Sequence, residues 1–335
     1  MASRLVDLVR QSAHRIPMPI GVFAGLELTG TTVKDVVTNA KAQTEAVLAL
    51  HEFFNTELLL TAMDLSAEAE LFGCQVNMTE EEIPSVIDRL LKTSYDVSQL
   101  DIPEINLGRT RIHLDSAADL VKHAQGYPVL GGVIGPFSLA GRLFGVSEAL
   151  ELSITDPHTL SQLLEKVTEF LIVYIKAFRQ VGTWGVIMAE PAAGLLSPRA
   201  MGQFSTQYIK QIVDMVNDEN FTVVYHNCGA KLVHLSSIIQ SGAEIYHFGA
   251  SMDILSALSR VDEKVILAGN LDPVNIFHSM TADKVYHHTH ELMDQTKNKS
   301  NFIISSGCDI PPHTSLDNLG AFFSAVRDFP YLQTR

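Results

Sequence analysis

The chain has 335 residues, of which 46 % are apolar and 19 % are charged. This composition excludes a disordered chain and a fibrous one, and it predicts a globular protein. Acidic side chains outnumber Lys and Arg by 38 to 24, which gives a formal net charge of −14, and the basic residues form no cluster. Because phosphate neutralisation requires clustered Lys and Arg, we expect no nucleic-acid partner.

Signals for export or membrane insertion are also missing from the sequence. The first ten residues, MASRLVDLVR, contain neither the apolar core nor the cleavage site of a signal peptide. No uncharged apolar run approaches the roughly 18–20 residues that cross a bilayer. The three cysteines are an odd number and too few for a disulfide scaffold, which suits a reducing compartment. We therefore predict a cytoplasmic protein with no membrane partner.

Eight apolar runs rich in β-branched residues alternate with helical patterns along the chain. Several of them are continuously apolar, which is typical of parallel strands covered on both faces. We predict strands at 18–23, 57–63, 128–134, 184–189, 221–226, 243–248, 264–269 and 301–306. Strand–helix alternation of this length is the pattern of a (β/α)8 TIM barrel, so the predicted fold class is α/β with a single domain over residues 1–335.

Several predicted helices begin at recognisable signals. A long helix is expected from 31 to about 54, and Asp156-Pro157 and Ser197-Pro198 each place a capping residue before a proline at the first helical position. Residues 64–127, between the second and third predicted strands, are too many for one crossover helix. We predict that they form an insertion over the barrel mouth.

A metal site is predicted where two strands end. The strand at 221–226 leads into His226 and Cys228, and the strand at 301–306 leads into Cys308. In a TIM barrel these residues emerge on one face, where an imidazole and two thiolates suit zinc and leave its fourth position open. The alternative is structural, since free cysteines are often small buried hydrophobes and histidines can be core residues. Cys74, which has no histidine neighbour, is predicted to pack only.

Other polar residues follow predicted strands at the same face, where TIM barrels carry catalytic groups. Glu190, after the strand at 184–189, is predicted to be a general acid/base or a fourth zinc ligand, and its alternative is a helix cap or a pair with Arg199. Asp272, before Pro273, is the second candidate catalytic residue, with helix capping as its alternative.

Five further residues are predicted to contact substrate: Asp64, His247, Asn270, Met18 and Phe23. His247 is expected to hydrogen-bond either the substrate or a metal ligand, unless it is a structural core histidine. Met18 and Phe23 suit an aromatic ring, although they equally suit the core.

Three motifs carry a resemblance to a known family: His226-Asn-Cys228-Gly229, Gly269-Asn-Leu-Asp-Pro273 and Gly307-Cys-Asp-Ile-Pro-Pro312. They resemble the uroporphyrinogen decarboxylase superfamily and, more closely, its zinc-dependent corrinoid methyltransferase branch. The resemblance spans the chain from Thr29 to the last helix. In that branch a His-x-Cys motif and a distant Cys hold zinc, and these match His226, Cys228 and Cys308.

The resemblance implies transfer of a methyl group between a small methylated compound and the cobalt of a separate corrinoid protein. We expect an aryl methyl ether as the methyl donor, so that the reaction is an O-demethylation. No Asp-x-His-x-x-Gly corrinoid motif occurs in this chain, which agrees with cobalamin being carried by the partner.

Three alternatives remain open at this point. The first is methyl transfer from the corrinoid to a thiol of the coenzyme M type, with Arg142 or Arg199 as the cation for its sulfonate. The second is decarboxylation of a uroporphyrinogen-like substrate, which the missing Arg-rich motif near Arg15 and the net charge of −14 disfavour. The third is a vestigial site in a non-enzymatic subunit.

Overall fold

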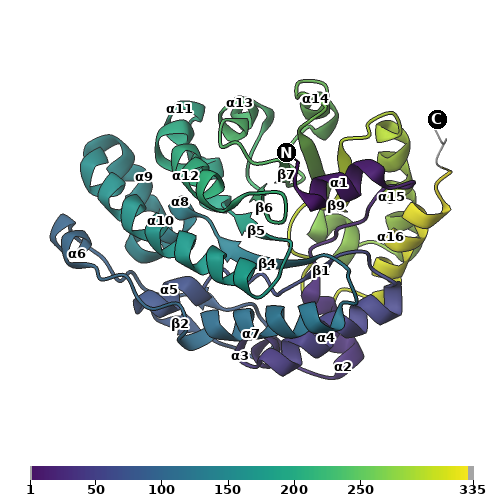
Figure 1. Cartoon of the computed structure of the whole chain (residues 1–335), viewed down its shortest axis with the longest axis horizontal. Helices are drawn as coiled ribbons and strands as arrows, with labels where there is room; N and C mark the ends of the chain where they lie inside the picture. The colour runs from purple at the N-terminus through teal and green to yellow at the C-terminus, as the bar shows by residue number, and fades with distance from the viewer. Residues whose placement is uncertain (1, 331–335) are drawn as a thin grey trace.

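The computed structural model describes residues 2–330, which form a curled parallel sheet with helices on its outer side (Figure 1). Neighbouring strands follow the order β1-β4-β5-β6-β7-β8-β9. Their bounds are β1 (Leu59–Leu60), β4 (Val129–Ile134), β5 (Gly185–Ala189), β6 (Thr222–Asn227), β7 (Ile245–Phe248), β8 (Ile266–Leu271) and β9 (Phe302–Ser306). An antiparallel pair, β2 (Val76–Asn77) and β3 (Ser85–Val86), is separate. The predicted α/β barrel is confirmed, with seven regular barrel strands in the described part.

Helices surround this sheet, and most of them connect one parallel strand to the next. The α-helices are α1 (Arg4–Gln11), α2 (Leu26–Thr29), α3 (Val33–Thr38), α4 (Ala40–Phe54), α5 (Ala67–Phe72), α6 (Ser94–Gln99), α7 (Gly108–His123), α8 (Pro136–Phe144), α9 (Val146–Thr155), α10 (Pro157–Gln180), α11 (Pro198–Met201), α12 (Gln207–Val216), α13 (Leu235–Ile239), α14 (Ile254–Leu258), α15 (Ala282–Thr296) and α16 (Leu316–Asp328). Short 3-10 helices are η1 (Val22–Gly25), η2 (Pro191–Leu195) and η4 (Leu232–His234), and short π-helices are η3 (Gly202–Thr206) and η5 (Pro273–His278).

The longest helix, α10, shows how the sequence builds the outer layer. Asp156 caps it by accepting a hydrogen bond from the Thr159 N–H (3.2 Å), and Pro157 occupies the first turn, as predicted. The helix packs against β5, α8 and α12. Its buried face follows helical spacing and includes Leu160, Leu163, Leu164, Val167 and Leu171.

The barrel interior is built from side chains that are register partners on neighbouring strands. One row consists of branched apolar residues: Ile187, Val224, Ile245 and Ile266. Two residues nearer the carboxyl ends, the equivalent row contains Ala189, His226, His247 and Ala268. Polar groups therefore replace apolar ones as the strands approach the mouth of the barrel.

The strand predicted at 18–23 is wrong. Only Pro17 pairs with β9, through an isolated bridge to Ile304, and the chain then turns into η1. Pro17 and Pro19 have no backbone N–H, so this segment cannot supply the regular hydrogen bonds of a strand. An irregular segment thus lies at the seam between β9 and β1, where an eighth strand was expected.

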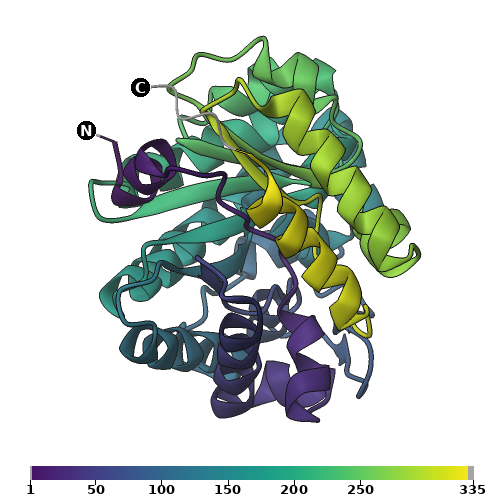
Figure 2. The same cartoon turned by 90° about the vertical axis from the view of Figure 1, so that its right-hand side faces the viewer.

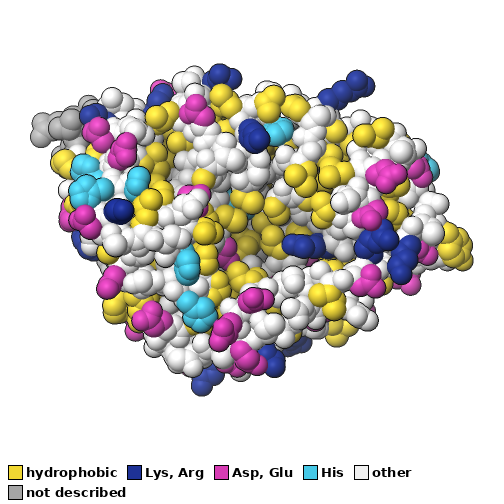
Figure 3. Space-filling view, turned by 180° about the vertical axis from the view of Figure 1, so that it is seen from behind, with side chains coloured by type: hydrophobic (Ala, Val, Ile, Leu, Met, Phe, Trp, Pro, Cys, Tyr) yellow, Lys and Arg dark blue, Asp and Glu magenta, His cyan; other side chains and the backbone are white. Residues whose placement is uncertain are grey.

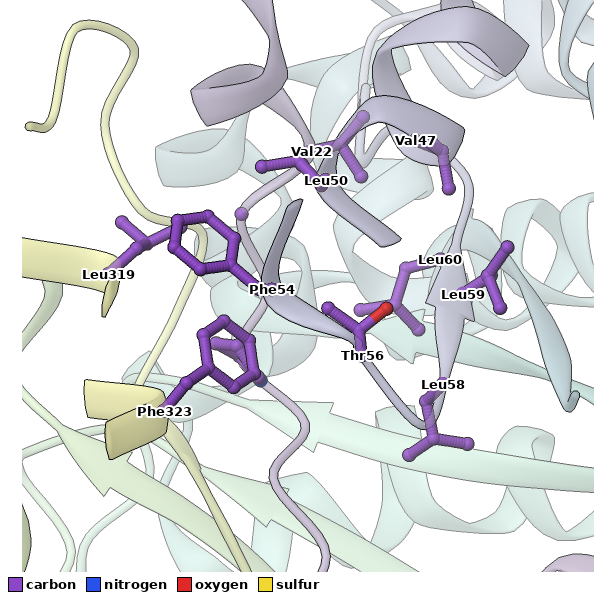
Figure 4. Close-up of a pocket in the computed structure, with 12 residues that line it drawn as sticks. Val22, Val47, Leu50, Phe54, Thr56, Leu58, Leu59, Leu60, Leu319 and Phe323 are labelled. Carbon is purple, nitrogen blue, oxygen red and sulfur yellow. The ribbon is translucent and has the colours of Figure 1, made fainter. Parts of the chain in front are cut away.

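A small cavity of about 50 Å³ lies beside this seam, between α4 and α16 (Figure 4). The stacked rings of Phe54 and Phe323, with centroids 5.1 Å apart, form part of its lining. Its other walls are largely apolar and include none of the residues predicted for the site. The cavity is therefore a feature of the seam rather than of the predicted chemistry.

The single helix predicted over 31–54 is also wrong, because Asn39 divides it. The Asn39 side chain accepts hydrogen bonds from the backbone N–H groups of Lys41 and Ala42, at 3.0 and 3.3 Å. It therefore caps the start of α4 and ends α3. The predicted cap at Ser197 is confirmed, since its hydroxyl accepts from the Ala200 N–H (3.2 Å).

Residues 64–127 contain α5, β2, β3, α6 and α7. Helix α7 packs on α4 and β4 and so serves as the crossover helix. Helix α6 lies at the periphery beside α10 (Figure 1), where the Lys166 ammonium group donates to the carbonyls of Ser98 and Leu100. A covering of the mouth by this insertion stays a prediction.

Helix α1 closes the end of the barrel where the strands begin. Arg4 donates hydrogen bonds to the carbonyls of Thr183 and Glu219, which precede β5 and β6. Arg10 donates to the carbonyl of Lys264, which precedes β8. Figure 2 shows α1 at this end, so the opposite end carries the carboxyl ends of the strands. Among the described residues, no helix is both long and apolar enough to span a membrane.

Candidate metal centre

The three predicted metal ligands converge at the carboxyl end of the barrel. His226 is the penultimate residue of β6, Cys228 follows that strand directly, and Cys308 lies just after β9. Their ligand atoms all lie within 4.8 Å of one another, and the Cys308 Sγ lies 3.7 Å from the His226 Nε2. Strands β6 and β9 are not neighbours in the sheet, so its curvature brings these residues together.

This spacing suits a zinc ion. Zn–N and Zn–S bonds of about 2.1 and 2.3 Å at a tetrahedral angle place the two ligand atoms roughly 3.6 Å apart. The observed distance between His226 Nε2 and Cys308 Sγ, 3.7 Å, is close to that value. His226 is buried, whereas both cysteines are partly exposed. The residues therefore fit a zinc site that is anchored in the barrel and open toward its mouth.

The two thiols are electrostatically coupled. A hydrogen bond from the Cys308 thiol lowers the pKa of Cys228 to about 7, although burial acts in the opposite direction. The same hydrogen bond, together with burial, raises the pKa of Cys308 because this thiol keeps the shared proton. The pair thus favours one thiolate near neutral pH, and thiolate is the form of cysteine that binds metals.

Glycines allow the loops at this face to pack closely. A β-carbon at Gly249, after β7, would lie 2.3 Å from the carbonyl oxygen of Cys228. One at Gly307 would lie 2.8 Å from the backbone nitrogen of Ala250. Larger residues at these two positions would push apart the loops that carry the cysteines.

His247 lies directly behind His226, as its register on β7 requires. The two Nδ1 atoms are 2.7 Å apart, and the Nε2 of His247 lies 2.7 Å from the Ser305 hydroxyl. Both rings are buried, and burial lowers the pKa of His247 well below its usual value. His247 was expected to contact either the substrate or a metal ligand, and in the structure its ring contacts the metal-ligand candidate His226.

The Glu190 side chain lies apart from this trio and contacts the start of α8. Its carboxylate accepts hydrogen bonds from the backbone N–H groups of Phe137 and Ser138 (both 2.8 Å) and from the Ser205 hydroxyl (2.9 Å). It is completely buried, and burial raises its pKa. The arrangement is that of a helix cap supplied from the next strand, so a catalytic role for Glu190 stays a prediction.

Three further candidates also have ion-pair or hydrogen-bond partners within the protein: Asp64, Asp272 and Asn270. Asp64 is buried and forms an ion pair with Arg109. Asp272 accepts from the backbone N–H groups at the start of η5, and the Asn270 amide donates to the carbonyls of Gly249 and Met252. These contacts support neighbouring segments, and roles in catalysis or substrate binding stay predictions.

The apolar candidates take different positions. The Met18 side chain is buried among the barrel residues, and its carbonyl oxygen accepts a hydrogen bond from Ser305 (2.5 Å). Phe23 lines a cavity of about 250 Å³ together with Glu27 and His313. Of these residues, His313 lies on the loop that follows Cys308. Figure 3, seen from the face opposite α1, shows a central hollow lined largely by hydrophobic side chains.

Two residues near the centre were missed in the sequence. Ser305 contacts His247, and a hydroxyl on the inward face of an apolar barrel strand was the available signal. Asp309, next to Cys308, has both carboxylate oxygens buried without a hydrogen-bond partner among the described residues. Burial raises its pKa well above the usual value. Only its position beside a predicted ligand could have drawn attention to it.

Comparison with known proteins identifies the family. The model of the uroporphyrinogen decarboxylase (URO-D) family matches residues 15–329. The chain belongs to this family. The resemblance predicted from the three motifs is therefore confirmed at the level of the URO-D family.

Proteins of two named activities are among the relatives. The chain is 27 % identical over 310 residues to methylcobamide:CoM methyltransferase MtbA of Methanosarcina acetivorans, covering 91 % of this chain and 90 % of that protein. It is 23 % identical over 337 residues to uroporphyrinogen decarboxylase of Hydrogenovibrio crunogenus, covering 96 % and 92 %. A solved methyltransferase structure from Methanosarcina mazei has the same fold, with a TM-score of 0.87, 23 % identity and 97 % coverage of both chains.

Proposed function

We propose that this URO-D family member is a zinc-dependent methyltransferase that moves a methyl group between a small methylated compound and the cobalt of a separate corrinoid protein. The observation that carries the proposal is the convergence of His226, Cys228 and Cys308 within 4.8 Å at the mouth of the barrel. The likeness to a methylcobamide:CoM methyltransferase over nine-tenths of both chains supports the same reaction class.

Each part of the centre has a definite task in this reaction. His226 and the two cysteines would hold the zinc ion, and three protein ligands would leave room on it for the oxygen or sulfur of the substrate. Zinc bound there supplies Lewis-acid stabilisation for the charge on that heteroatom. The buried His226 anchors the site, while the partly exposed cysteines keep it accessible from the mouth.

An aryl methyl ether is the methyl donor that we propose. The apolar hollow at the mouth (Figure 3) would suit an aromatic ring, since small-molecule sites are mostly apolar with few polar groups. Phenoxide is a poor leaving group unless its charge is stabilised, which is the task of the metal centre.

A second candidate reaction is methyl transfer from the corrinoid to a thiol. The specific observation in its favour is the likeness to MtbA, a methylcobamide:CoM methyltransferase. Of the two cations considered for a sulfonate, Arg142 lies in α8 with its pKa lowered by burial, and Arg199 is exposed in α11.

The experiment pairs elemental analysis with two transfer assays. We expect about one zinc per chain, and methylation of reduced, Co(I) corrinoid protein by methoxybenzene derivatives in a zinc-dependent manner. Demethylation of a methylated corrinoid protein by 2-mercaptoethanesulfonate would instead establish the thiol reaction. A metal-free protein that decarboxylates uroporphyrinogen and transfers no methyl group would overturn the proposal.

A further inference from the structure

The ring of His226 is held by an ordered series of hydrogen bonds that runs away from the metal centre. Its Nδ1 contacts the Nδ1 of His247, whose Nε2 contacts the Ser305 hydroxyl, and that hydroxyl contacts the Met18 carbonyl. The four successive groups come from β6, β7, β9 and the irregular seam segment. All of them are buried.

The direction of each hydrogen bond follows from the last group of the series, the Met18 carbonyl. A carbonyl oxygen can only accept, and the Ser305 hydroxyl lies 2.5 Å from the Met18 carbonyl and 3.0 Å from the Ser306 carbonyl. Whichever of the two it contacts, its single hydrogen is directed to a carbonyl. The hydroxyl oxygen can therefore only accept from His247, which places the ring hydrogen of His247 on Nε2.

The same reasoning then fixes His226. A neutral imidazole carries one N–H, and complete burial disfavours a second proton on His247. The Nδ1 of His247 is consequently an acceptor, so the Nδ1 of His226 must donate to it across 2.7 Å. This leaves the lone pair of His226 on Nε2, the atom that lies 3.7 Å from the Cys308 sulfur.

We propose that His247 and Ser305 are positioning residues, which hold His226 in the tautomer whose Nε2 lone pair faces the metal centre before any metal binds. Metal-bound histidines generally donate their second N–H to a carboxylate, carbonyl or water. Here the acceptor is a second, neutral histidine, whose own orientation Ser305 and the Met18 carbonyl determine. The proposal rests on the proposed function, because it names the residues that orient one ligand of the proposed zinc site.

The tautomer can be read directly in the metal-free protein. We expect long-range ¹H–¹⁵N correlation spectra of histidine-labelled, chelator-treated protein to show His226 protonated at Nδ1 and His247 at Nε2. Assignment uses the His226→Gln and His247→Asn variants. A wild-type spectrum in which His226 carries its hydrogen on Nε2 would overturn the proposal, whatever the protein's activity.

Variants then test the consequence for metal binding. His247→Phe removes the acceptor, and we expect zinc affinity, measured by chelator competition, to fall about 10- to 100-fold, as for other partners of metal ligands. His247→Asn keeps an oxygen near the position of Nδ1 and should restore affinity to within a few-fold of wild type. Unchanged affinity in His247→Phe, shown folded by circular dichroism, would contradict the role of His247.

Ser305 has a matched control in its neighbour. Ser305→Ala should populate the wrong tautomer of His226 in the metal-free spectrum, because His247 loses the hydroxyl that accepts from its Nε2 and keeps only the backbone of Ser306 as a partner there. Ser306→Ala also removes a buried hydroxyl from β9, but this hydroxyl accepts from the Ile20 N–H and does not contact His247. The tautomer should not change in Ser306→Ala, and equal spectra for both variants would contradict the role of Ser305.

This test separates the positioning role from the proposed function. If wild-type protein shows the expected tautomers but binds no zinc, the hydrogen-bonded series stands and the proposed function fails. If it binds zinc with the opposite tautomers in the metal-free state, the proposed function stands and the positioning role fails.

Discussion

Two groups of polar residues lie at the carboxyl ends of the strands, and the lone pairs of their side chains face different groups. Around Glu190, two N–H groups and a hydroxyl occupy the carboxylate oxygens. At the metal centre, the Nε2 of His226 and the sulfurs of Cys228 and Cys308 face one another instead. Strand-end position is therefore common to both groups, and only the metal centre presents a cluster of soft ligand atoms.

This comparison separates residues that hold the barrel together from residues available for chemistry. A buried acceptor surrounded by donors contributes to stability, and its removal leaves those donors unsatisfied. A set of converging ligand atoms contributes to binding, and its removal should spare the fold.

The largest effect is expected for Cys308→Ser. Replacing one of three soft ligands should lower zinc affinity by at least about 100-fold, beyond the loss that follows removal of a partner behind a ligand. Methyl transfer should fall with the metal content, while the thermal unfolding midpoint of the metal-free protein should change little. Elemental analysis, the transfer assay and calorimetry on the same preparation measure the three quantities.

Cys74→Ser is the matched control for that variant. Cys74 is buried near α8, where its sulfur lies 3.8 Å from the Arg142 carbonyl oxygen, and it is not part of the metal-ligand cluster. Its zinc content and transfer activity should equal those of the wild type. Full activity in Cys308→Ser, or zinc loss in Cys74→Ser, would show that the ligand set is assigned incorrectly.

Glu190→Ala should have the opposite profile. Loss of the carboxylate leaves two backbone N–H groups and the Ser205 hydroxyl without their acceptor, so we expect a loss of about 3–5 kcal/mol in unfolding free energy. Zinc stoichiometry in the folded fraction should stay at the wild-type value. Denaturant unfolding and elemental analysis measure both.

Glu190→Gln distinguishes the cap from a catalytic group. The amide keeps one acceptor oxygen, so stability should recover in part. Loss of methyl transfer in a variant that retains wild-type stability and zinc would restore the general acid/base role predicted from the sequence.

Glu68 allows a test of pH dependence outside the metal centre. One of its oxygens accepts from the Ile134 N–H, the other is buried without a partner among residues 2–330, and burial raises its pKa to about 7. The raised pKa stabilises the fold below about pH 4.5, where the unfolded carboxyl is also protonated, and this contribution is lost as the pH rises through 7. Relative to Glu68→Gln, the wild type should therefore lose up to about 3 kcal/mol between pH 4.5 and pH 8.

Urea unfolding of the two proteins at both pH values measures this difference. The exposed Glu81→Gln variant is the control, and its stability relative to wild type should be the same at both pH values. A Glu68→Gln variant that differs from the wild type equally at pH 4.5 and pH 8 would contradict the assignment of a raised pKa.

The sequence predicted the features that depend on local pattern. Continuously apolar runs placed β4 and β5 to within one residue, because such runs have few other possible structures in a chain of this composition. Parallel strands end at one face, which is why His226, Cys228 and Cys308 could be grouped before their distances were known. The strand predicted at 18–23 does not form, because Pro19 within it and Pro17 just before it lack the backbone N–H that a regular strand needs.

Other features depend on contacts that no local pattern shows. Glu190 caps a helix that begins more than fifty positions earlier in the chain, so the donors around it could not be read from its own neighbours. Pairing of His226 with His247 requires the register between β6 and β7, and the contact of Ser305 with His247 requires the curvature of the sheet from β7 to β9. Buried hydrogen-bond networks are therefore the part of this site that needed the structure.

The smallest effect is expected for Asp272→Ala. The Asp272 side chain accepts from the backbone N–H groups of Val274 and Asn275, at 2.9 and 2.8 Å, at the start of η5. Loss of such a cap costs about 1 kcal/mol, so the unfolding midpoint should drop slightly while zinc content and methyl transfer stay at the wild-type level. Asp272→Asn, which keeps an accepting oxygen, should recover most of that stability. If methyl transfer is lost in both variants while their stability is retained, Asp272 takes part in the reaction and is not only a helix cap. The residues available for chemistry would then include the end of β8 as well as the metal centre.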